Sequence, residues 1–337
     1  MPLGSAKVGL FGAAGATAAG GQRGVFWASN TGSVTNVIQY ITINSAGDAT
    51  DFGDTTEKMG DKGCTSNGGD DRGVSAGGYD AVSDTSNVIE YITISTPGNA
   101  TNFGDLTYRT QYGRYALATV SNGTNDRGVW MGGANVQAPY YYNTIDYVTI
   151  SSAGNATDFG DMTDQFHEAA AMSNGTDERG ISFAGYKDAP GAAETDVIEY
   201  ITINSAADST DFGDALGAKG NMAGCSNDTS DRGIAAGGYR TDDSPRRHNV
   251  IQYITITSTG NATDFGDLTT TLAQGSGLSN GTGERGIIGG GSNDASGTKQ
   301  DVIQYITINS TGNAADFGDL LAAQSAGGTT GLSDAAE

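Results

Sequence analysis

Residues 260–268, Gly-Asn-Ala-Thr-Asp-Phe-Gly-Asp-Leu, form the phrase that decides the fold, because near-copies of it recur along the chain. In protein kinases Asp-Phe-Gly holds a magnesium ion, but a kinase needs one such site, fed by a Gly-rich loop, a partner Lys and a catalytic-loop Asp. None of these companions is found in the sequence. The phrase is therefore predicted to be a structural repeat. Its six copies begin near residues 51, 102, 158, 211, 264 and 316.

Three other elements recur with the phrase in a fixed order. A weak element ending in Ser-Asn-Gly precedes an acidic-Arg-Gly sequence with a short apolar run, and then comes Asn/Asp-Val-Ile-Xaa-Tyr-Ile-Thr-Ile. The last run is apolar on both alternating faces, as expected of a strand that packs on both sides. We name the four elements in chain order: A ends in Ser-Asn-Gly, B begins at the acidic-Arg-Gly sequence, C is the Val-Ile-Xaa-Tyr-Ile-Thr-Ile run, and D is the Phe-Gly-Asp phrase. Four short strands in roughly fifty residues are typical of a kelch-type propeller blade.

The sequence therefore predicts an all-β, six-bladed β-propeller over residues 21–337, with residues 1–20 as an N-terminal arm or docking segment. The first recognisable repeat element in the chain is element B at Arg23, so the first blade lacks an A element before it. Residues 331–334 near the C-terminus resemble residues 277–280, which form the end of an A element. We expect this C-terminal segment to supply strand A to the N-terminal blade, which removes open sheet edges. Residues 14–19 are the competing candidate for that strand.

Composition limits the partners. The chain carries 39 acidic and 17 basic residues and a net charge of −22, so nucleic acid is not an expected partner. No apolar run approaches 18 residues, and the Gly-rich N-terminal segment is a poor signal peptide, so neither membrane insertion nor secretion is expected. Cys64 and Cys225 have no zinc-type spacing and are expected to be free thiols.

The repeated charged residues are predicted to be structural. Each blade carries one Arg, which we expect to pair with a carboxylate of the Phe-Gly-Asp phrase. The phenylalanines are expected to pack between blades. Calcium binding by the acidic turns stays open as an alternative, although the ligand order of an EF-hand is missing. The repeat residues are Arg23, Arg72, Arg127, Arg179, Arg232, Arg285, Asp54, Asp105, Asp161, Asp214, Asp267 and Asp319.

Catalysis is not expected. His167 and His248 lie in unlike loops, and the chain has no nucleophile elbow or metal-type His cluster. No catalytic residue, cofactor or metal is predicted. A propeller glycosidase with paired carboxylates is the remaining enzymatic alternative.

Antiparallel order places the A–B and C–D turns on one face of the disc and the B–C and D–A loops on the other. The first set is nearly identical in all copies and defines the constant face; the second set differs between copies and defines the variable face. Exposed Tyr and Arg anchor protein and sugar contacts, so the variable face is the predicted binding face. Its candidate residues are Tyr108, Arg109, Tyr112, Arg114, Tyr115, Tyr140, Tyr141, Tyr142, Arg240, Arg246, Arg247 and His248.

These phrases resemble those of kelch-like repeat proteins encoded by marine bacteriophages, in particular phages of cyanobacteria. The resemblance covers about residues 23–334. It implies a non-enzymatic virion protein, either a capsid decoration or a tail-associated fibre protein, assembled in the host cytoplasm. Its partners would be other virion proteins or a glycan or protein of the host surface, and virion symmetry would set any oligomer. A multivalent lectin-like propeller is the alternative.

Overall fold

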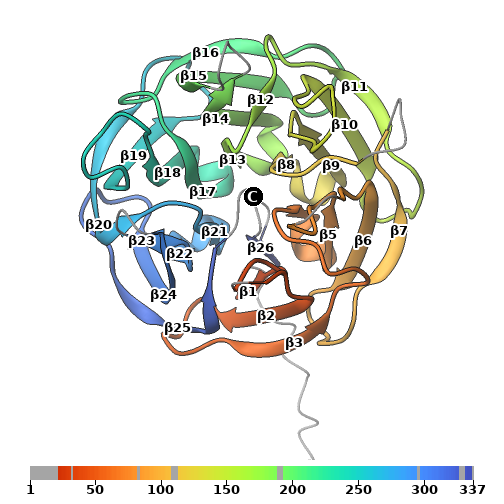
Figure 1. Ribbon diagram of the computed structural model, residues 1–337, viewed down its shortest axis with the longest axis horizontal. Helices are drawn as coiled ribbons and strands as arrows, with labels where there is room; N and C mark the ends of the chain where they lie inside the picture. The colour runs from red at the N-terminus through yellow and green to blue at the C-terminus, as the bar shows by residue number, and fades with distance from the viewer. Residues whose placement is uncertain are drawn as a thin grey trace, which may run out of the picture.

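The computed structural model is a closed ring of six antiparallel β-sheets around a central axis (Figure 1). The structure describes residues 22–31, 33–81, 84–107, 113–187, 193–293, 297–325 and 331–335. Within these ranges there is no helix long and apolar enough to cross a membrane. The predicted arm, residues 1–20, lies outside the described residues, as does the competing strand at 14–19.

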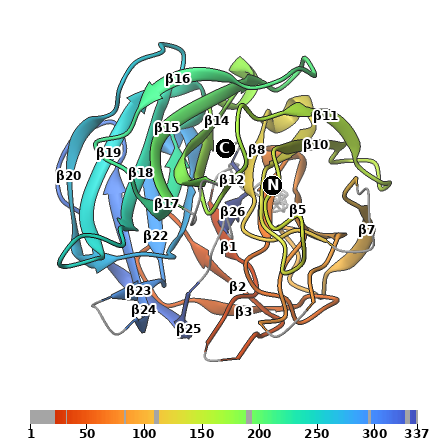
Figure 2. The ribbon, with the colours of Figure 1, turned by 45° about the horizontal axis from the view of Figure 1, so that its top comes forward.

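Each blade carries the four strands A to D, counted from the axis to the rim, as the tilted view also shows (Figure 2). Blade 1 contains β26 (Gly331–Ser333), β1 (Arg23–Phe26), β2 (Val37–Thr42) and β3 (Thr50–Asp54). Blade 2 contains β4 (Gly63–Ser66), β5 (Arg72–Ala76), β6 (Val88–Thr93) and β7 (Thr101–Asp105). Blade 3 contains β8 (Ala118–Ser121), β9 (Arg127–Met131), β10 (Thr144–Thr149) and β11 (Thr157–Asp161). Blade 4 contains β13 (Ala170–Ser173), β14 (Arg179–Lys187), β15 (Ala193–Thr202) and β16 (Thr210–Asp214), with β12 (Phe166–His167) added beside β14. Blade 5 contains β17 (Gly220–Ser226), β18 (Arg232–Tyr239), β19 (His248–Thr255) and β20 (Thr263–Leu272). Blade 6 contains β21 (Ser276–Ser279), β22 (Arg285–Gly289), β24 (Thr298–Thr307) and β25 (Ala315–Gln324), with β23 (Ser292–Asn293) beside β24.

Among the described residues, short 3-10 turns join strands A and B in five blades. A residue with φ between 68° and 73° ends each turn and directly precedes the repeat Arg. The turns are η1 (Gly68–Asp70), η2 (Gly123–Asn125), η3 (Gly175–Asp177), η4 (Asp228–Ser230) and η5 (Gly281–Gly283).

The ring is closed by the C-terminal strand, as the sequence predicts. Strand β26 pairs antiparallel with β1, with Leu332 opposite Val25. The backbone N–H of Arg23 donates to Asp334 Oδ1 at 2.9 Å, and the N–H of Arg72 donates in the same way to Asn67 Oδ1 at 2.8 Å in blade 2. Asp334 therefore takes the place of the Asn that ends the A strands of the other blades.

Apolar cores fill the spaces between neighbouring blades. The core between blades 1 and 2 joins Phe52 of β3 to Ile92 and Ile94 of the next blade, and Leu332 of the closing strand is part of it. Equivalent phenylalanines lie in the other cores, which confirms the expected packing of the Phe-Gly-Asp phrase. Because every blade face is covered by a neighbour, no blade can be removed without exposing two apolar surfaces.

The glycine of the phrase is required by the next blade. Gly53 has φ +148°, and a Cβ atom there would lie 2.4 Å from the carbonyl oxygen of Gly98 in the C–D turn of blade 2. In the same turn Asn99 Oδ1 accepts a hydrogen bond from the N–H of Asp54 at 3.0 Å, and the N–H of Ala100 donates to the Asp54 carbonyl at 2.8 Å. The phrase is thus a backbone link between successive blades.

The expected ion pair between the repeat arginines and the Asp residues of this phrase is wrong. Among the described residues, none of the ion pairs involves a repeat Arg. Each guanidinium instead donates to a main-chain carbonyl at the end of the next blade's C strand, at 2.7 to 3.2 Å, and lies over the Tyr ring of its own C strand, 4.3 to 4.7 Å from the centroid. The planar fork of Arg can also donate to a main-chain carbonyl, and this acceptor is present in every blade whatever the side chain. The pairs are Arg23–Ile94, Arg72–Ile150, Arg127–Ile203, Arg179–Ile256, Arg232–Ile308 and Arg285–Ile43.

We expect Arg232→Gln to lower the free energy of unfolding by about 2 kcal/mol, because it removes a charge-assisted hydrogen bond between blades and a cation–π contact. Arg240→Gln is the matched control, since the Arg240 side chain is 42 % exposed and its contact with Asp243 is 3.9 Å long. That change should cost less than about 1 kcal/mol. Equal losses in urea unfolding would contradict the role given to the repeat arginines.

Candidate functional site

The constant face is occupied by hydrogen bonds that repeat from blade to blade. Asn67 accepts from the N–H of Arg72, and its amide donates to Asp126 Oδ1 of the next blade at 3.0 Å. Asp126 in turn accepts from the N–H of Ser151 at 2.9 Å. Much of the polar capacity of these turns is therefore used within the ring.

The variable face carries two loops that differ in kind from the rest. The B–C loop of blade 3 contains Tyr140, which is 56 % exposed, followed by the half-buried Tyr141 and Tyr142. Three predicted residues of the preceding D–A segment, Tyr108, Arg109 and Tyr112, lie outside the described residues.

The B–C loop of blade 5 holds the predicted basic cluster. Arg246 Nη1 lies 3.3 Å from the hydroxyl of Tyr239, and the Arg247 guanidinium lies 5.4 Å from the centroid of the same ring. His248 Nε2 lies 3.3 Å from Asp243 Oδ2, and burial lowers the pKa of His248. Of the four predicted residues in this loop, Arg246 is exposed and the other three are half-buried, with the Arg240 side chain 42 % exposed.

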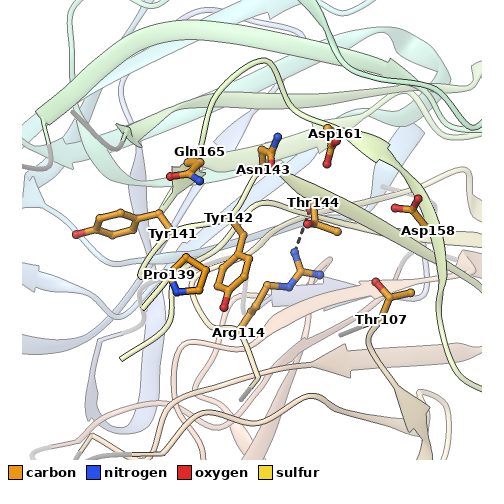
Figure 3. A pocket seen from close by; sticks show the side chains of 10 residues that line it. All are labelled: Thr107, Arg114, Pro139, Tyr141, Tyr142, Asn143, Thr144, Asp158, Asp161 and Gln165. Carbon is orange, nitrogen blue, oxygen red and sulfur yellow. Dashed lines mark hydrogen bonds between the residues drawn. The ribbon is translucent and has the colours of Figure 1, made fainter. Parts of the chain in front are cut away.

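A cavity of about 400 Å³ opens between blades 2 and 3. In Figure 3 the side chains of Pro139, Tyr141 and Tyr142 stand at one end of the view and those of Thr107 and Asp158 at the other, with Arg114 between them. Asn143, Thr144, Asp161 and Gln165 complete the lining. The cavity thus joins an aromatic B–C loop to the carboxylates of a D strand.

Arg114 lies at the base of this cavity and is not free to bind a partner. Its side chain is 2 % exposed and forms a buried ion pair with Asp146. Nη1 also donates to the carbonyls of Gly132 at 2.7 Å and Thr144 at 3.0 Å. The sequence prediction that Arg114 belongs to a binding surface is therefore not supported by its position, which is that of a structural cation.

Aromatic rings form an arc around the inner strands on the variable face. Tyr79 and Tyr115 stack with centroids 5.2 Å apart, and His167 is sandwiched between Tyr141 at 4.6 Å and Tyr186 at 5.4 Å. His167 is 8 % exposed, and burial lowers its pKa to about 4, so it is neutral at physiological pH. Its role is that of an aromatic spacer, because a neutral imidazole in this stack carries no charge to a ligand.

Inside the arc, the residues that lead into strands A form a collar around the axis. The N–H groups of Ala116, Glu168, Asn221 and Gln274 donate in sequence to the carbonyls of Asp61, Ala116, Glu168 and Asn221, at 2.8 to 3.0 Å. Burial and, to a lesser extent, the charge of Asp61 raise the pKa of Glu168 to about 7, against the opposing effect of the hydrogen bond from Asn221. The collar therefore places one carboxyl group that titrates near neutral pH at the axis.

A second buried ion pair joins strands A and C of blade 2. Lys62 Nζ lies 3.0 Å from Glu90 Oε1, and both side chains are fully buried. Glu90 also accepts from Trp27 Nε1 of blade 1 at 3.1 Å and from the hydroxyl and N–H of Thr56, at 2.7 Å each. Sequence reasoning missed this pair, although Xaa of the C-strand phrase is Gln in three blades and acidic in the other three.

The other chemistry-bearing groups are buried or dispersed. Cys64 and Cys225 are both free and buried, as expected, and burial raises the pKa of Cys64 to about 12. Within the described ranges, no group of three or more His, Cys, Asp or Glu side chains is arranged to hold a metal ion.

Comparison with known proteins adds no family to this description. No family model matches the chain, and no curated protein matches its sequence.

Proposed function

We propose that the chain is a non-enzymatic structural protein of a phage virion, in a capsid-decoration or tail-associated position, that binds another virion protein or a host-surface component through its variable face. The kelch-like phage resemblance of the repeat phrases is the reason for placing it on a virion. Virion assembly in the host cytoplasm, and any symmetry of the bound protein, follow from that placement.

One observation carries the choice of face. The polar groups of the constant-face turns form hydrogen bonds to the next blade, as those of Asn67 and Asp126 do. The variable face instead presents Tyr140 and Arg240, which project with 56 % and 42 % exposure from loops that no other blade repeats. Aromatic and Arg side chains of this kind dominate the binding energy of protein interfaces.

The proposal predicts that purified virions contain this chain and that its attachment or host binding depends on the variable face. The double change Tyr140→Ala with Arg240→Ala should lower association at least tenfold while leaving the thermal unfolding midpoint within about 2 °C, since both side chains are exposed. Ser152→Ala with Thr259→Ala, in exposed C–D turns, is the control on the constant face. Mass spectrometry that fails to find the chain in virions would contradict the proposal.

One observation favours the lectin-like alternative. Equivalent surface hollows of about 320 and 370 Å³ lie at the C–D turns of blades 2 and 5, lined by Tyr91 and Asn99 in one and by Tyr253 and Asn261 in the other. Repeated hollows at equivalent positions are what a multivalent sugar-binding propeller would use. Their asparagines, however, already accept the N–H groups of Asp54 and Asp214.

A further inference from the structure

We propose that the cavity between blades 2 and 3 binds a neutral hexose unit of a glycan. The inference deepens the proposed function, since it rests on the variable face being the binding face and names the class of ligand that one part of it takes. The cavity of about 400 Å³ falls within the range of small-molecule sites and is the right order of size for one or two sugar rings.

The lining has the two components that recognise a sugar. Tyr141, Tyr142 and Pro139 supply apolar and aromatic surface at one end, where the C–H face of a pyranose packs. Asp158 and Asp161, which both belong to strand β11, supply carboxylates that can accept hydrogen bonds from sugar hydroxyls. Charge-assisted hydrogen bonds to carboxylates are stronger than those between neutral groups and fix the orientation of a polyol.

The carboxylates of Asp158 and Asp161 are not engaged by other groups among the described residues. Both residues are exposed, and within the described residues neither side chain accepts a hydrogen bond or forms an ion pair. The links between blades use only the main chain of Asp161, whose N–H donates to Asp208 Oδ1 at 3.0 Å. Their acceptor capacity is therefore available to a ligand.

Charge selects against acidic ligands. Among the described residues that line the cavity, the guanidinium is that of Arg114, and Asp146 neutralises it. Two unpaired carboxylates then leave the cavity negative on a chain of net charge −22. Phosphorylated, sulfated and sialylated ligands are repelled, which leaves neutral sugars as the favoured class.

The site is specific to blade 3. Asp161 has an Asp counterpart in every blade, and Asp158 has one in every blade but blade 2, where Asn102 takes its place; Tyr-Tyr-Asn at 141–143, in contrast, occurs only in this B–C loop. The repeat thus provides matched controls: Asp264 occupies the position of Asp158 in blade 5, where no aromatic loop of this kind covers it.

The test uses the full chain and a panel of neutral mono- and oligosaccharides, with sialylated and sulfated glycans and spermidine as comparison ligands, read by saturation-transfer NMR and glycan array. We expect binding of at least one neutral glycan, weakened roughly tenfold by Asp158→Asn and by Tyr141→Ala, and unchanged by Asp264→Asn. Because Tyr141 also stacks on His167, Asp158→Asn is the decisive variant; its exposed position predicts an unchanged unfolding midpoint.

Three results would overturn the inference: no neutral glycan bound by the folded protein, binding confined to anionic glycans or spermidine, or equal weakening by Asp158→Asn and Asp264→Asn. The last result would assign the binding to a feature that the blades share rather than to this cavity. None of them bears on whether virions contain the chain, so failure of the sugar site and failure of the virion proposal are separately visible.

Discussion

Replacing Glu90 by Gln is expected to lower the free energy of unfolding by about 3 kcal/mol at pH 7. Lys62 would be left fully buried without its carboxylate partner, and an uncompensated buried charge is among the most costly defects in a protein core. The amide also cannot accept both from Trp27 and from the two donor groups of Thr56 as the carboxylate does. Urea unfolding measures the loss.

Another blade of the repeat shows which second substitution should restore the stability that Glu90→Gln removes. Blade 5 carries Met222 and Gln252 at the positions of Lys62 and Glu90, and Gln252 Nε2 lies 3.5 Å from Met222 Sδ. The double change Lys62→Met with Glu90→Gln should therefore return stability to within about 1 kcal/mol of the parent, since a neutral pair without a buried charge can replace a buried ion pair without loss. A double variant no more stable than Glu90→Gln would contradict the explanation.

Glu199, at the same C-strand position in blade 4, provides the opposite case. It accepts from Ser209 and Thr163. Among the described residues no Lys or Arg pairs with it. Burial raises its pKa, whereas that of Glu90 is held below its usual value because Lys62 and Thr56 together outweigh burial.

The two glutamates therefore give opposite pH profiles. The contribution of Glu90 is complete above the unfolded pKa of about 4.3 and is lost as the pH falls through its folded pKa. Ionised Glu199 destabilises the fold as the pH rises from the unfolded towards the raised folded pKa. Glu199→Gln should thus be neutral or stabilising at pH 7, unlike Glu90→Gln.

The second large effect is expected from the closing strand. Deleting residues 331–337 removes β26, leaves one edge of β1 unpaired, and takes Leu332 out of the core between blades 1 and 2. We expect loss of the cooperative unfolding transition, because truncation of one buried Leu alone costs about 2–5 kcal/mol and a strand is lost with it. Circular dichroism and urea unfolding report the change.

A milder variant keeps this prediction testable if the truncated chain aggregates. Leu332→Ala leaves the strand in place and should cost about 3 kcal/mol, since the side chain is 1 % exposed. Leu321→Ala is the control, because Leu321 is 51 % exposed. A full-length and a truncated chain of equal stability would mean that the ring is not closed by this strand.

The repeat made the fold predictable, whereas the internal polar contacts were not. The six Phe-Gly-Asp phrases and the echo of residues 277–280 at 331–334 predict the blades and their closure, because each repeat must bury its faces against a neighbour. The partner of Arg23 was predicted wrongly, since an acceptor on the main chain leaves no trace in the sequence. Lys62 facing Glu90 could have been found by comparing the blades, as both depart together from Met222 and Gln252.

The candidate site was predicted only in part. Tyr140, Tyr141 and Tyr142 were found because a run of three tyrosines departs from the repeat. Asp158 was assigned to the structural phrase, and only the fold shows that its side chain lines a cavity beside that loop. Arg114 was selected for its charge, although Asp146 already neutralises it.

The central claim is that the repeated face holds the ring together and the variable face meets a partner. A cryo-electron microscopy map of purified virions tests it most directly. We expect a six-bladed ring whose B–C and D–A loops, with Tyr140 and Arg240 among them, abut density of another molecule or project from the particle towards the host. A map in which the chain is absent, or in which it is held only through its C–D turns while the variable face points at empty solvent inside the particle, would contradict the account.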